Sequence, residues 1–138
     1  MDRKALEAVR RSTRPGGFLV LWLTNKDWIL QHFQARSWSR TGGTVLLEDR
    51  SFDRCSSFLR SRWEFFHRRG PTLRSKGAFQ VDLRLYSPRE LRALLDSAGW
   101  TMRSLATNFQ GDPIDARNPQ GGAMVAVAAR PTGDRRPR

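Results

Sequence analysis

A short, uninterrupted apolar run, FLVLWL at residues 18–23, constrains the fold of this chain more than any other feature. It follows a Pro-Gly-Gly turn at 15–17 and does not alternate between apolar and polar residues. Such runs are typical of strands buried on both faces of a parallel sheet, which need a neighbour on each edge. A helix is predicted before it, over about 3–13 with Asp2 as N-cap, and the sequence offers no strand ahead of that helix. The order of elements therefore predicts the second half of a doubly wound sheet.

Turn signals and periodicity predict the middle of the chain. The segment at about 26–36 fits a helix capped by Asn25, and a loop follows at 41–43. Three later segments fit the strands of an antiparallel meander, namely 44–50, 57–67 and 79–86. In the last of these strands we expect Tyr86 to point outward. We expect four residues of that strand to point inward, namely Phe79, Val81, Leu83 and Leu85.

The clearest local signal is the segment SPRE at 87–90, which is a capping box with proline at the first helical position. The helix that it begins ends at Gly99, and its inward residues are Leu91, Leu94, Leu95 and Ala98. The predicted segments after it are a strand at about 100–107, a polar loop at 109–120, a strand at 123–130 and a frayed tail at 131–138.

Several segments together resemble a known superfamily. LEAVRRSTRPGGFLVLWLTN (6–25) resembles the late helix, turn and fifth strand of class I S-adenosylmethionine-dependent methyltransferases. LLEDRSFD (46–53) and VDLRLYSPRELRALLDSAGW (81–100) are similar to the inserted segment and a following helix of its small-molecule members. NFQGDPID (108–115) and the later MVAVAARP resemble the closing loop and last strand. The resemblance covers nearly the whole chain and rests on the order and spacing of these segments.

The resemblance implies a fold class, an activity and a cofactor. The fold is expected to be α/β, the C-terminal half of a doubly wound Rossmann-like methyltransferase sheet with an inserted antiparallel β meander. Residues 1–130 would form this partial domain, with the insert at about 41–86 and a basic tail at 131–138. The implied reaction is methyl transfer from S-adenosylmethionine to a small-molecule acceptor.

The sequence departs from the family where the cofactor would bind. Members hold S-adenosylmethionine with a glycine-rich loop, whereas the glycine pairs here, at 16–17, 42–43 and 121–122, are not followed by helices. We therefore expect the chain to be incomplete and inactive by itself, either as a truncated or mis-started reading frame or as one chain of a split enzyme. A missing N-terminal half or a second chain would complete the sheet. A third possibility is a non-catalytic subunit that stabilises a methyltransferase.

Charge supports a different alternative. The chain carries 25 basic and 13 acidic residues, a net charge of +12, and all but three of its basic residues are arginine. Such a balance suggests an anionic partner, and a basic module that binds nucleic acid or an acidic protein is the alternative function. The arginines are spread along the chain in clusters of at most three and form no recognisable nucleic-acid motif. Nucleic acid is therefore not the partner that the sequence favours.

Candidate substrate-side residues follow the apolar strand, because ligands of open α/β sheets bind beyond the carboxyl ends of the strands. Asn25 is a candidate to orient a substrate oxygen or amine, and a helix cap is its structural alternative. Asp27 is a candidate proton acceptor, or simply an acid favoured in a first helical turn. Trp28 is a candidate to stack on the acceptor, or a core residue.

Three further candidates lie outside this segment. Arg50 belongs to a charged patch around Phe52 and is a candidate to bind a carboxylate or phosphate, or else forms local ion pairs. Tyr86 is a candidate to reach the substrate with its hydroxyl, or is half-buried and structural. Phe109 belongs to a loop that is a candidate to close over the site, or a plain connector.

Other classes of site are disfavoured. A lone Cys55 excludes an internal disulfide and a cysteine-based zinc cluster, and His32 and His67 lack ligand partners at the right spacing. No apolar run reaches the roughly 18 residues of a membrane helix, and the N-terminus lacks the features of a secretory signal. We expect no metal, no membrane association and a cytoplasmic location.

Overall fold

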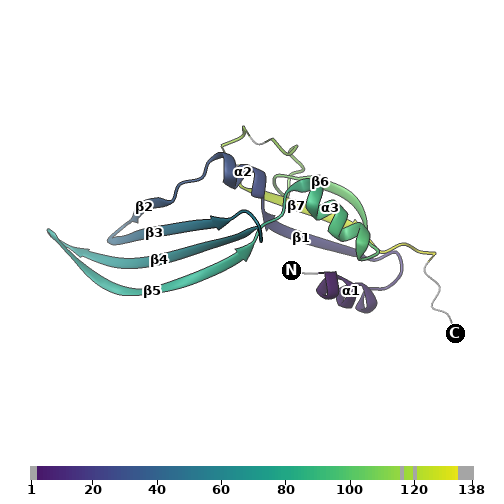
Figure 1. Cartoon of the computed structure of the whole chain (residues 1–138), viewed down its shortest axis with the longest axis horizontal. Helices are drawn as coiled ribbons and strands as arrows, with labels where there is room; N and C mark the ends of the chain where they lie inside the picture. The colour runs from purple at the N-terminus through teal and green to yellow at the C-terminus, as the bar shows by residue number, and fades with distance from the viewer. Residues whose placement is uncertain (1–2, 116, 120, 134–138) are drawn as a thin grey trace. The chain divides into compact units, whose positions relative to one another are not determined.

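A computed structural model of the chain describes residues 3–115, 117–119 and 121–133 (Figure 1). The expected N-cap Asp2 and the end of the expected tail, 134–138, lie outside the described residues. The chain forms two compact units. Unit 1 comprises Met1–Gln31 and Tyr86–Arg138, and unit 2 comprises His32–Leu85.

Unit 1 is a three-stranded sheet with helices (Figure 1). Its elements are α1 (Arg3–Ser12), β1 (Phe18–Thr24), α2 (Lys26–Gln31), α3 (Pro88–Ser97), β6 (Thr101–Ala106) and β7 (Ala123–Ala129). The strand order is β1-β7-β6, and β7 pairs antiparallel with both of its neighbours. The two outer strands, β1 and β6, therefore run parallel to each other. The helices and strands of unit 1 agree with those predicted in the N-terminal and C-terminal parts of the chain.

The prediction that the apolar strand is buried on both faces is wrong. In β1, Leu19, Leu21 and Leu23 pack against the core, whereas the alternate side chains face outward. The exposed fractions are 66% for Phe18, 54% for Val20 and 70% for Trp22. Within the described residues β1 pairs only with β7, so it is an edge strand with one apolar face in solvent.

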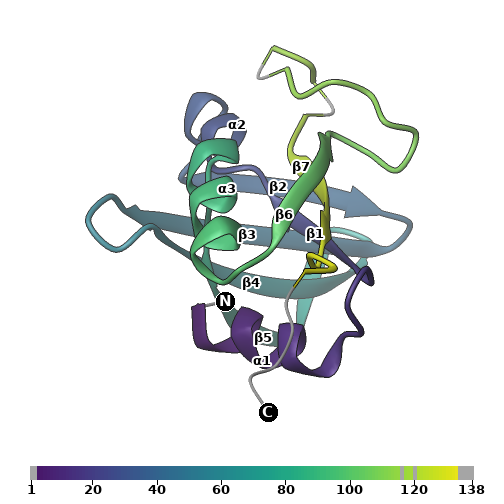
Figure 2. The same ribbon diagram turned by 90° about the vertical axis from the view of Figure 1, so that its right-hand side faces the viewer.

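The core of unit 1 joins its helices to its sheet. Leu6 of α1 and Leu91 and Leu95 of α3 are buried together with Trp100. The indole Nε1 of Trp100 donates a hydrogen bond of 3.1 Å to the carbonyl oxygen of Leu6, so one side chain links the start of β6 to α1. Figure 2 shows α3 running alongside β6. Burial of this apolar set is the main stabilising contribution to unit 1.

The ends of α3 form as the sequence predicts. The Ser87 hydroxyl accepts a hydrogen bond from the Glu90 backbone N–H at 3.2 Å, and the Glu90 carboxylate accepts one from the Ser87 N–H at 2.8 Å. Gly99 has a φ of +78° after the helix end, where a Cβ would lie 2.8 Å from the Arg10 Nε. The positive φ favours glycine at this position, and an added Cβ would also have to displace the Arg10 side chain.

Unit 2 is an antiparallel meander of four long strands (Figure 1). The strands are β2 (Arg36–Thr41), β3 (Thr44–Asp53), β4 (Phe58–Arg69) and β5 (Thr72–Arg84), and they are neighbours in the order of the sequence. Gly42 and Gly70, both with a φ of +58°, allow the tight turns between β2 and β3 and between β4 and β5. The pairing of β4 with β5 is irregular between Phe65 and Phe66.

Unit 2 corrects three predictions. The helix predicted over about 26–36 ends at Gln31, and residues 36–41 form β2, a strand that was not predicted and that pairs with β3. The last strand begins at Thr72, well before the predicted residue 79. Two of its supposedly inward residues are exposed, Phe79 at 47% and Leu83 at 44%.

Tyr86 is a further correction, because it does not point outward from this strand. It lies after the end of β5, is 6% exposed and belongs to the core of unit 1.

We expect Trp100→Phe to lower the free energy of unfolding of unit 1 by about 2 kcal/mol, because it removes packing volume and leaves the buried Leu6 carbonyl without its donor. The matched control is Trp38→Phe in unit 2, where the indole is 71% exposed and a change below about 0.5 kcal/mol is expected. Urea denaturation followed by circular dichroism measures both values. Equal losses in the two variants would contradict this account of the core.

Candidate functional site

The carboxyl end of β1 is organised by Asn25, which is 1% exposed. Its backbone N–H donates to the Gly122 carbonyl oxygen at 3.0 Å, and its carbonyl oxygen accepts from the Ile29 N–H at 3.0 Å. Its side-chain Oδ1 accepts from the Asp27 N–H at 3.1 Å. Asn25 therefore caps α2, and its side-chain oxygen is engaged in holding the first turn of that helix.

Tyr86 is brought next to Asn25 by the return of the chain into unit 1. The two residues form an isolated parallel β-bridge, and the Lys26 N–H donates to the Tyr86 carbonyl oxygen at 3.0 Å. The Lys26 ammonium group also forms an ion pair with the carboxylate of Glu90. Burial works to raise the pKa of Glu90, but the hydrogen bonds from Lys26 and Ser87 outweigh it and hold that pKa below its ordinary value.

Trp28 joins the same cluster through the loop that precedes β7. Its Nε1 donates to the Asn118 carbonyl oxygen at 2.8 Å. Its ring lies against two glycines, since a Cβ on Gly121 would be 2.9 Å from Cδ1 and a Cβ on Gly122 would be 3.2 Å from Cε3. Neither glycine can carry a side chain without moving the indole. Trp28 is half-buried and serves as a wall between α2 and this loop.

Asp27 and Phe109 lie outside this cluster. Asp27 is exposed in the first turn of α2. Phe109 is 68% exposed, and its ring centroid lies 6.2 Å from that of Trp22 on the outward face of β1. Trp22 is not among the residues predicted from the sequence, because a continuous apolar run gives no sign of which of its residues face solvent. The pairing with Phe109 appears only in the folded chain.

Arg50 lies in unit 2, on β3, where it forms an ion pair with Glu48. The Glu48 carboxylate also accepts hydrogen bonds from the Trp63 Nε1 at 2.7 Å and the Ser37 hydroxyl at 3.3 Å. The hydrogen bond from Arg50 is the largest cause that lowers the pKa of Glu48, aided by Trp63 and Ser37 and opposed by partial burial. The local ion pair, the alternative considered from the sequence, is thus what the structure contains.

Aromatic rings lie beside this ion pair. Trp63 has ring centroids at 5.2 Å from Phe79 and 6.5 Å from Phe65, and the two phenylalanine rings stack at 5.7 Å. Strand alternation places these rings on the same face as Glu48, since Trp63 pairs with both Glu48 and Phe79. The sheet of unit 2 therefore has one face that combines aromatic rings with a partly buried ion pair.

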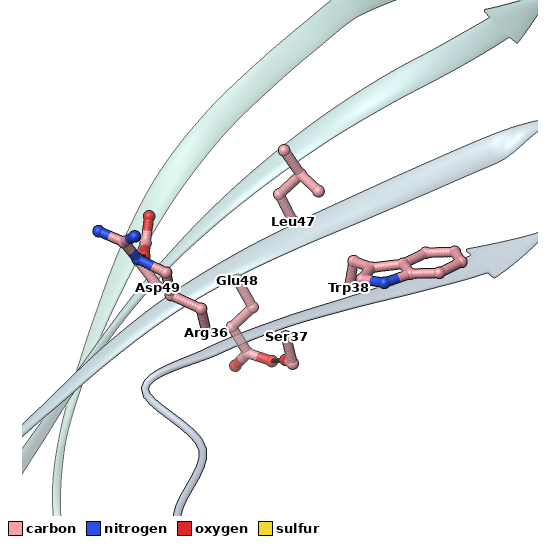
Figure 3. Close-up of a pocket in the computed structure, with 6 residues that line it drawn as sticks. All are labelled: Arg36, Ser37, Trp38, Leu47, Glu48 and Asp49. Carbon is pink, nitrogen blue, oxygen red and sulfur yellow. Dashed lines mark hydrogen bonds and ion pairs between the residues drawn. The ribbon is translucent and has the colours of Figure 1, made fainter.

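A hollow of about 400 Å³ lies between β2 and β3 (Figure 3). Its lining residues are Arg36, Ser37, Trp38, Leu47, Glu48 and Asp49. The Nε of Arg36 lies 3.0 Å from the Asp49 carboxylate, so these charges neutralise each other. Trp38 and Leu47 supply an apolar wall, and both are exposed. None of the six candidate site residues lines this hollow, although Glu48 and Asp49 belong to the charged patch expected around Phe52. The β2 side of the hollow was missed because β2 was not predicted as a strand.

The described residues do not fit a binding site for S-adenosylmethionine. Each of the three glycine pairs leads into a strand rather than opening a helix, and the first turn of α3 is occupied by its own capping box. The part of the chain that the structure describes also holds no group of three or more His, Cys, Asp or Glu side chains able to bind a metal ion. None of its helices is long and apolar enough to cross a membrane.

Comparison with known proteins identifies the fold. No protein-family model matches the chain, and no curated protein matches its sequence. The solved structure of a S-adenosylmethionine-dependent methyltransferase from Clostridium acetobutylicum aligns with 94% of this chain, with a TM-score of 0.76 and 11% sequence identity. The structure of the CcbJ methyltransferase from Streptomyces caelestis aligns with 91% of this chain, with a TM-score of 0.73 and 21% identity. The structure of the sugar N-methyltransferase KedS8 from a Streptoalloteichus species aligns with 94% of this chain, with a TM-score of 0.52 and 20% identity.

The matches cover only part of each solved methyltransferase. The chain spans 50% of the Clostridium enzyme, 51% of CcbJ and 48% of KedS8. Its fold is therefore that of a S-adenosylmethionine-dependent methyltransferase over about half the length of such an enzyme. This agrees with the partial α/β methyltransferase fold predicted from the sequence.

The cap at the end of β1 can be tested by substitution. Asn25→Ala is expected to lower the free energy of unfolding of unit 1 by about 1–2 kcal/mol, because the Asp27 N–H loses its acceptor. Asn25→Asp keeps an acceptor oxygen at the same position and should lose less. Thermal unfolding followed by circular dichroism ranks the variants, and an alanine variant as stable as the aspartate variant would contradict the capping role.

The Glu48 ion pair predicts a pH dependence. A carboxyl whose pKa is lowered on folding contributes stability above its ordinary value of 4.5, and that contribution is lost as the pH falls through the folded value. Glu48→Gln should therefore lower the free energy of unfolding by about 2 kcal/mol at pH 7, with the difference shrinking towards pH 3.

Chemical denaturation at pH 7, 5 and 3.5 measures this difference. The control is Glu64→Gln on β4, which breaks a more exposed pair with Arg62 and should cost below about 1 kcal/mol. A difference for Glu48→Gln that stays constant with pH would show that the carboxylate charge is not responsible.

Proposed function

We propose that this chain forms the substrate-side half of a S-adenosylmethionine-dependent methyltransferase that acts on a small-molecule acceptor. The observation that carries the proposal is the fold match, which covers 94% of this chain but only half of a methyltransferase, at a TM-score of 0.76. The described residues lack a loop suited to the cofactor, so the cofactor would be held by another part of the enzyme. That part is a second chain or a further stretch of the same polypeptide.

The free edge of β1 supports a docking place for the cofactor-binding half. Backbone groups on this edge have no strand partner among the described residues, and an unpaired edge accepts an additional strand. Because β1 and β6 already run parallel, a parallel strand beside β1 would extend the sheet towards a doubly wound arrangement. Phe18, Val20 and Trp22 form an exposed apolar face that helices of that half would cover.

The substrate would lie beyond the carboxyl end of β1, where ligands of open α/β sheets bind. Asp27 presents an exposed carboxylate there, and we assign it the role of accepting the proton that an amine acceptor loses. Trp28 offers a half-buried aromatic wall. An amine acceptor is supported by the likeness to KedS8, which is described as a sugar N-methyltransferase.

The remaining candidates take lesser roles in this proposal. Asn25 and Tyr86 are buried and hold the end of β1, so they act as positioning residues. Phe109, exposed on the loop after β6, would contact the acceptor or the cofactor-binding half. Arg50 keeps its ion pair with Glu48 and has no assigned role towards the acceptor.

Native mass spectrometry of the protein purified from its natural host tests the proposal. We expect either a single polypeptide of roughly twice 15.9 kDa, because half of a methyltransferase is present here, or a 15.9 kDa chain bound to a partner that contains a glycine-rich loop. The purified species should bind S-adenosylmethionine in calorimetry, whereas the 138-residue chain alone should not. A lone, stable 15.9 kDa monomer would contradict the proposal.

A surface variant tests the docking face separately. Trp22→Glu places a charge on the exposed face of β1 and should abolish recovery of the partner half, or expose that half to proteolysis in a longer polypeptide. Trp38→Glu is the matched control, since its indole in unit 2 is exposed to the same degree, 71% against 70%. Equal effects of the two variants would show that the β1 face is not the docking surface.

A further inference from the structure

The charges of unit 2 are not evenly distributed over its sheet. Four arginines near the middle of the sheet and towards its other end form ion pairs. The pairs are Arg36 with Asp49, Arg50 with Glu48, Arg60 with Asp82 and Arg62 with Glu64. Five cations at the end that carries the β2–β3 and β4–β5 turns form no ion pair with any described residue. These residues, here called the basic end, are Arg40, Arg68, Arg69, Arg74 and Lys76.

The absence of acids at this end is a property of the local sequence. Residues 37–47 and 65–81 contain no aspartate or glutamate. The fold brings these two segments together, because the Arg68 N–H donates to the Gly43 carbonyl oxygen at 2.8 Å. The Nε of Arg40 donates to the Gly42 carbonyl oxygen at 3.2 Å and the Nε of Arg68 to that of Gly70 at 3.0 Å, so both guanidinium groups stay beside their turns.

Such a cluster of like charges has an electrostatic cost. Neighbouring strands are about 4.8 Å apart, so cations on β2, β4 and β5 lie within roughly one or two Debye lengths of about 8 Å at physiological salt. All five side chains belong to exposed residues. A bound polyanion would relieve the repulsion, and it would release its own counterions on binding.

An exposed aromatic residue lies beside the basic end. Trp38 is on β2, two residues before Arg40, so the two side chains are on the same face of the strand. Its indole is 71% exposed and borders the hollow of about 400 Å³ between β2 and β3, next to Leu47 (Figure 3). A flat ring of this kind, adjacent to cations, is a platform for an unpaired nucleobase.

We propose that the basic end of unit 2 binds single-stranded nucleic acid, with the cations contacting phosphates and Trp38 stacking on a base. A single strand fits better than a duplex because only an unpaired base can lie flat on the indole. An anionic membrane or an acidic protein would use the cations but has no base to place on Trp38. The proposal concerns residues of unit 2, and none of them is a candidate residue at the carboxyl end of β1.

Fluorescence anisotropy with a fluorescein-labelled dT20 oligonucleotide tests the proposal on the full chain. The logarithm of the binding constant should fall linearly with the logarithm of the salt concentration, with a slope of about −3.5 if all five cations contact phosphates. Binding of dT20 should be tighter than binding of a duplex of the same length. No detectable binding at 50 mM salt would overturn the proposal.

A matched pair of double variants separates the basic end from net charge. The double variant of Arg68→Ala with Arg69→Ala should weaken binding by about 10- to 30-fold at 100 mM salt and reduce the slope by about 1.4. The control, Arg60→Ala with Arg62→Ala, removes the same charge from the same strand and should change binding less than about twofold. Equal weakening by the two double variants would mean that only net charge matters, and would overturn the proposal.

Two further arms test the stacking and the class of partner. Trp38→Ala should weaken dT20 binding at least about fivefold. Equally tight binding to phosphatidylcholine vesicles with 30% phosphatidylserine, or an unchanged affinity in Trp38→Ala, would overturn the assignment to single-stranded nucleic acid. Circular dichroism verifies folding, and Arg74→Ala with Lys76→Ala replaces the first double variant if that variant does not fold.

Discussion

Two backbone hydrogen bonds at the end of β1 hold unit 1 together across the excursion of the chain into unit 2. The Asn25 N–H bonds to Gly122 and the Lys26 N–H bonds to Tyr86, each at 3.0 Å. The chain leaves unit 1 after Gln31 and returns at Tyr86, so these bonds join three segments that are far apart in sequence. The capped start of α3 and the candidate residues Asp27 and Trp28 adjoin this junction. Burial of Asn25 and Tyr86 shields it from water, which makes the bonds costly to break.

The candidate residues beside this junction lie next to an edge of the sheet that has no strand partner among the described residues. Trp28 and Asp27 follow it directly, but within the described residues β1 has a free edge and an uncovered apolar face. Solved methyltransferases of this fold are about twice as long, and the proposed cofactor-binding half would occupy that edge. An exposed hydrophobic edge strand favours pairing with another strand, so it is consistent with the proposed covering half.

Net charge alone does not indicate which partner the chain binds, whereas the positions of the arginines in the fold are informative. A charge of +12 spread over 138 residues is compatible with many partners. The fold pairs the arginines in the middle of unit 2 with acids on the same or adjacent strands, and it leaves five cations together at one end. The positive charge of unit 2 that acidic side chains do not neutralise is therefore concentrated at the basic end.

The sequence by itself determined the elements whose signals are local, because caps, turns and periodicity act over a few residues. The capping box at 87–90 and the glycine that ends α3 form as predicted, and a strand forms at 18–23 although only one of its faces is buried. The order of these segments identified the partial methyltransferase fold. Tertiary structure alone decided that residues 36–41 form strand β2, that Tyr86 is buried and that one face of β1 is exposed. It also decided how charge is distributed over unit 2. These features depend on pairing and packing between residues distant in the chain. Local sequence patterns do not indicate which strand will pair with a given edge or which residues a side chain will contact.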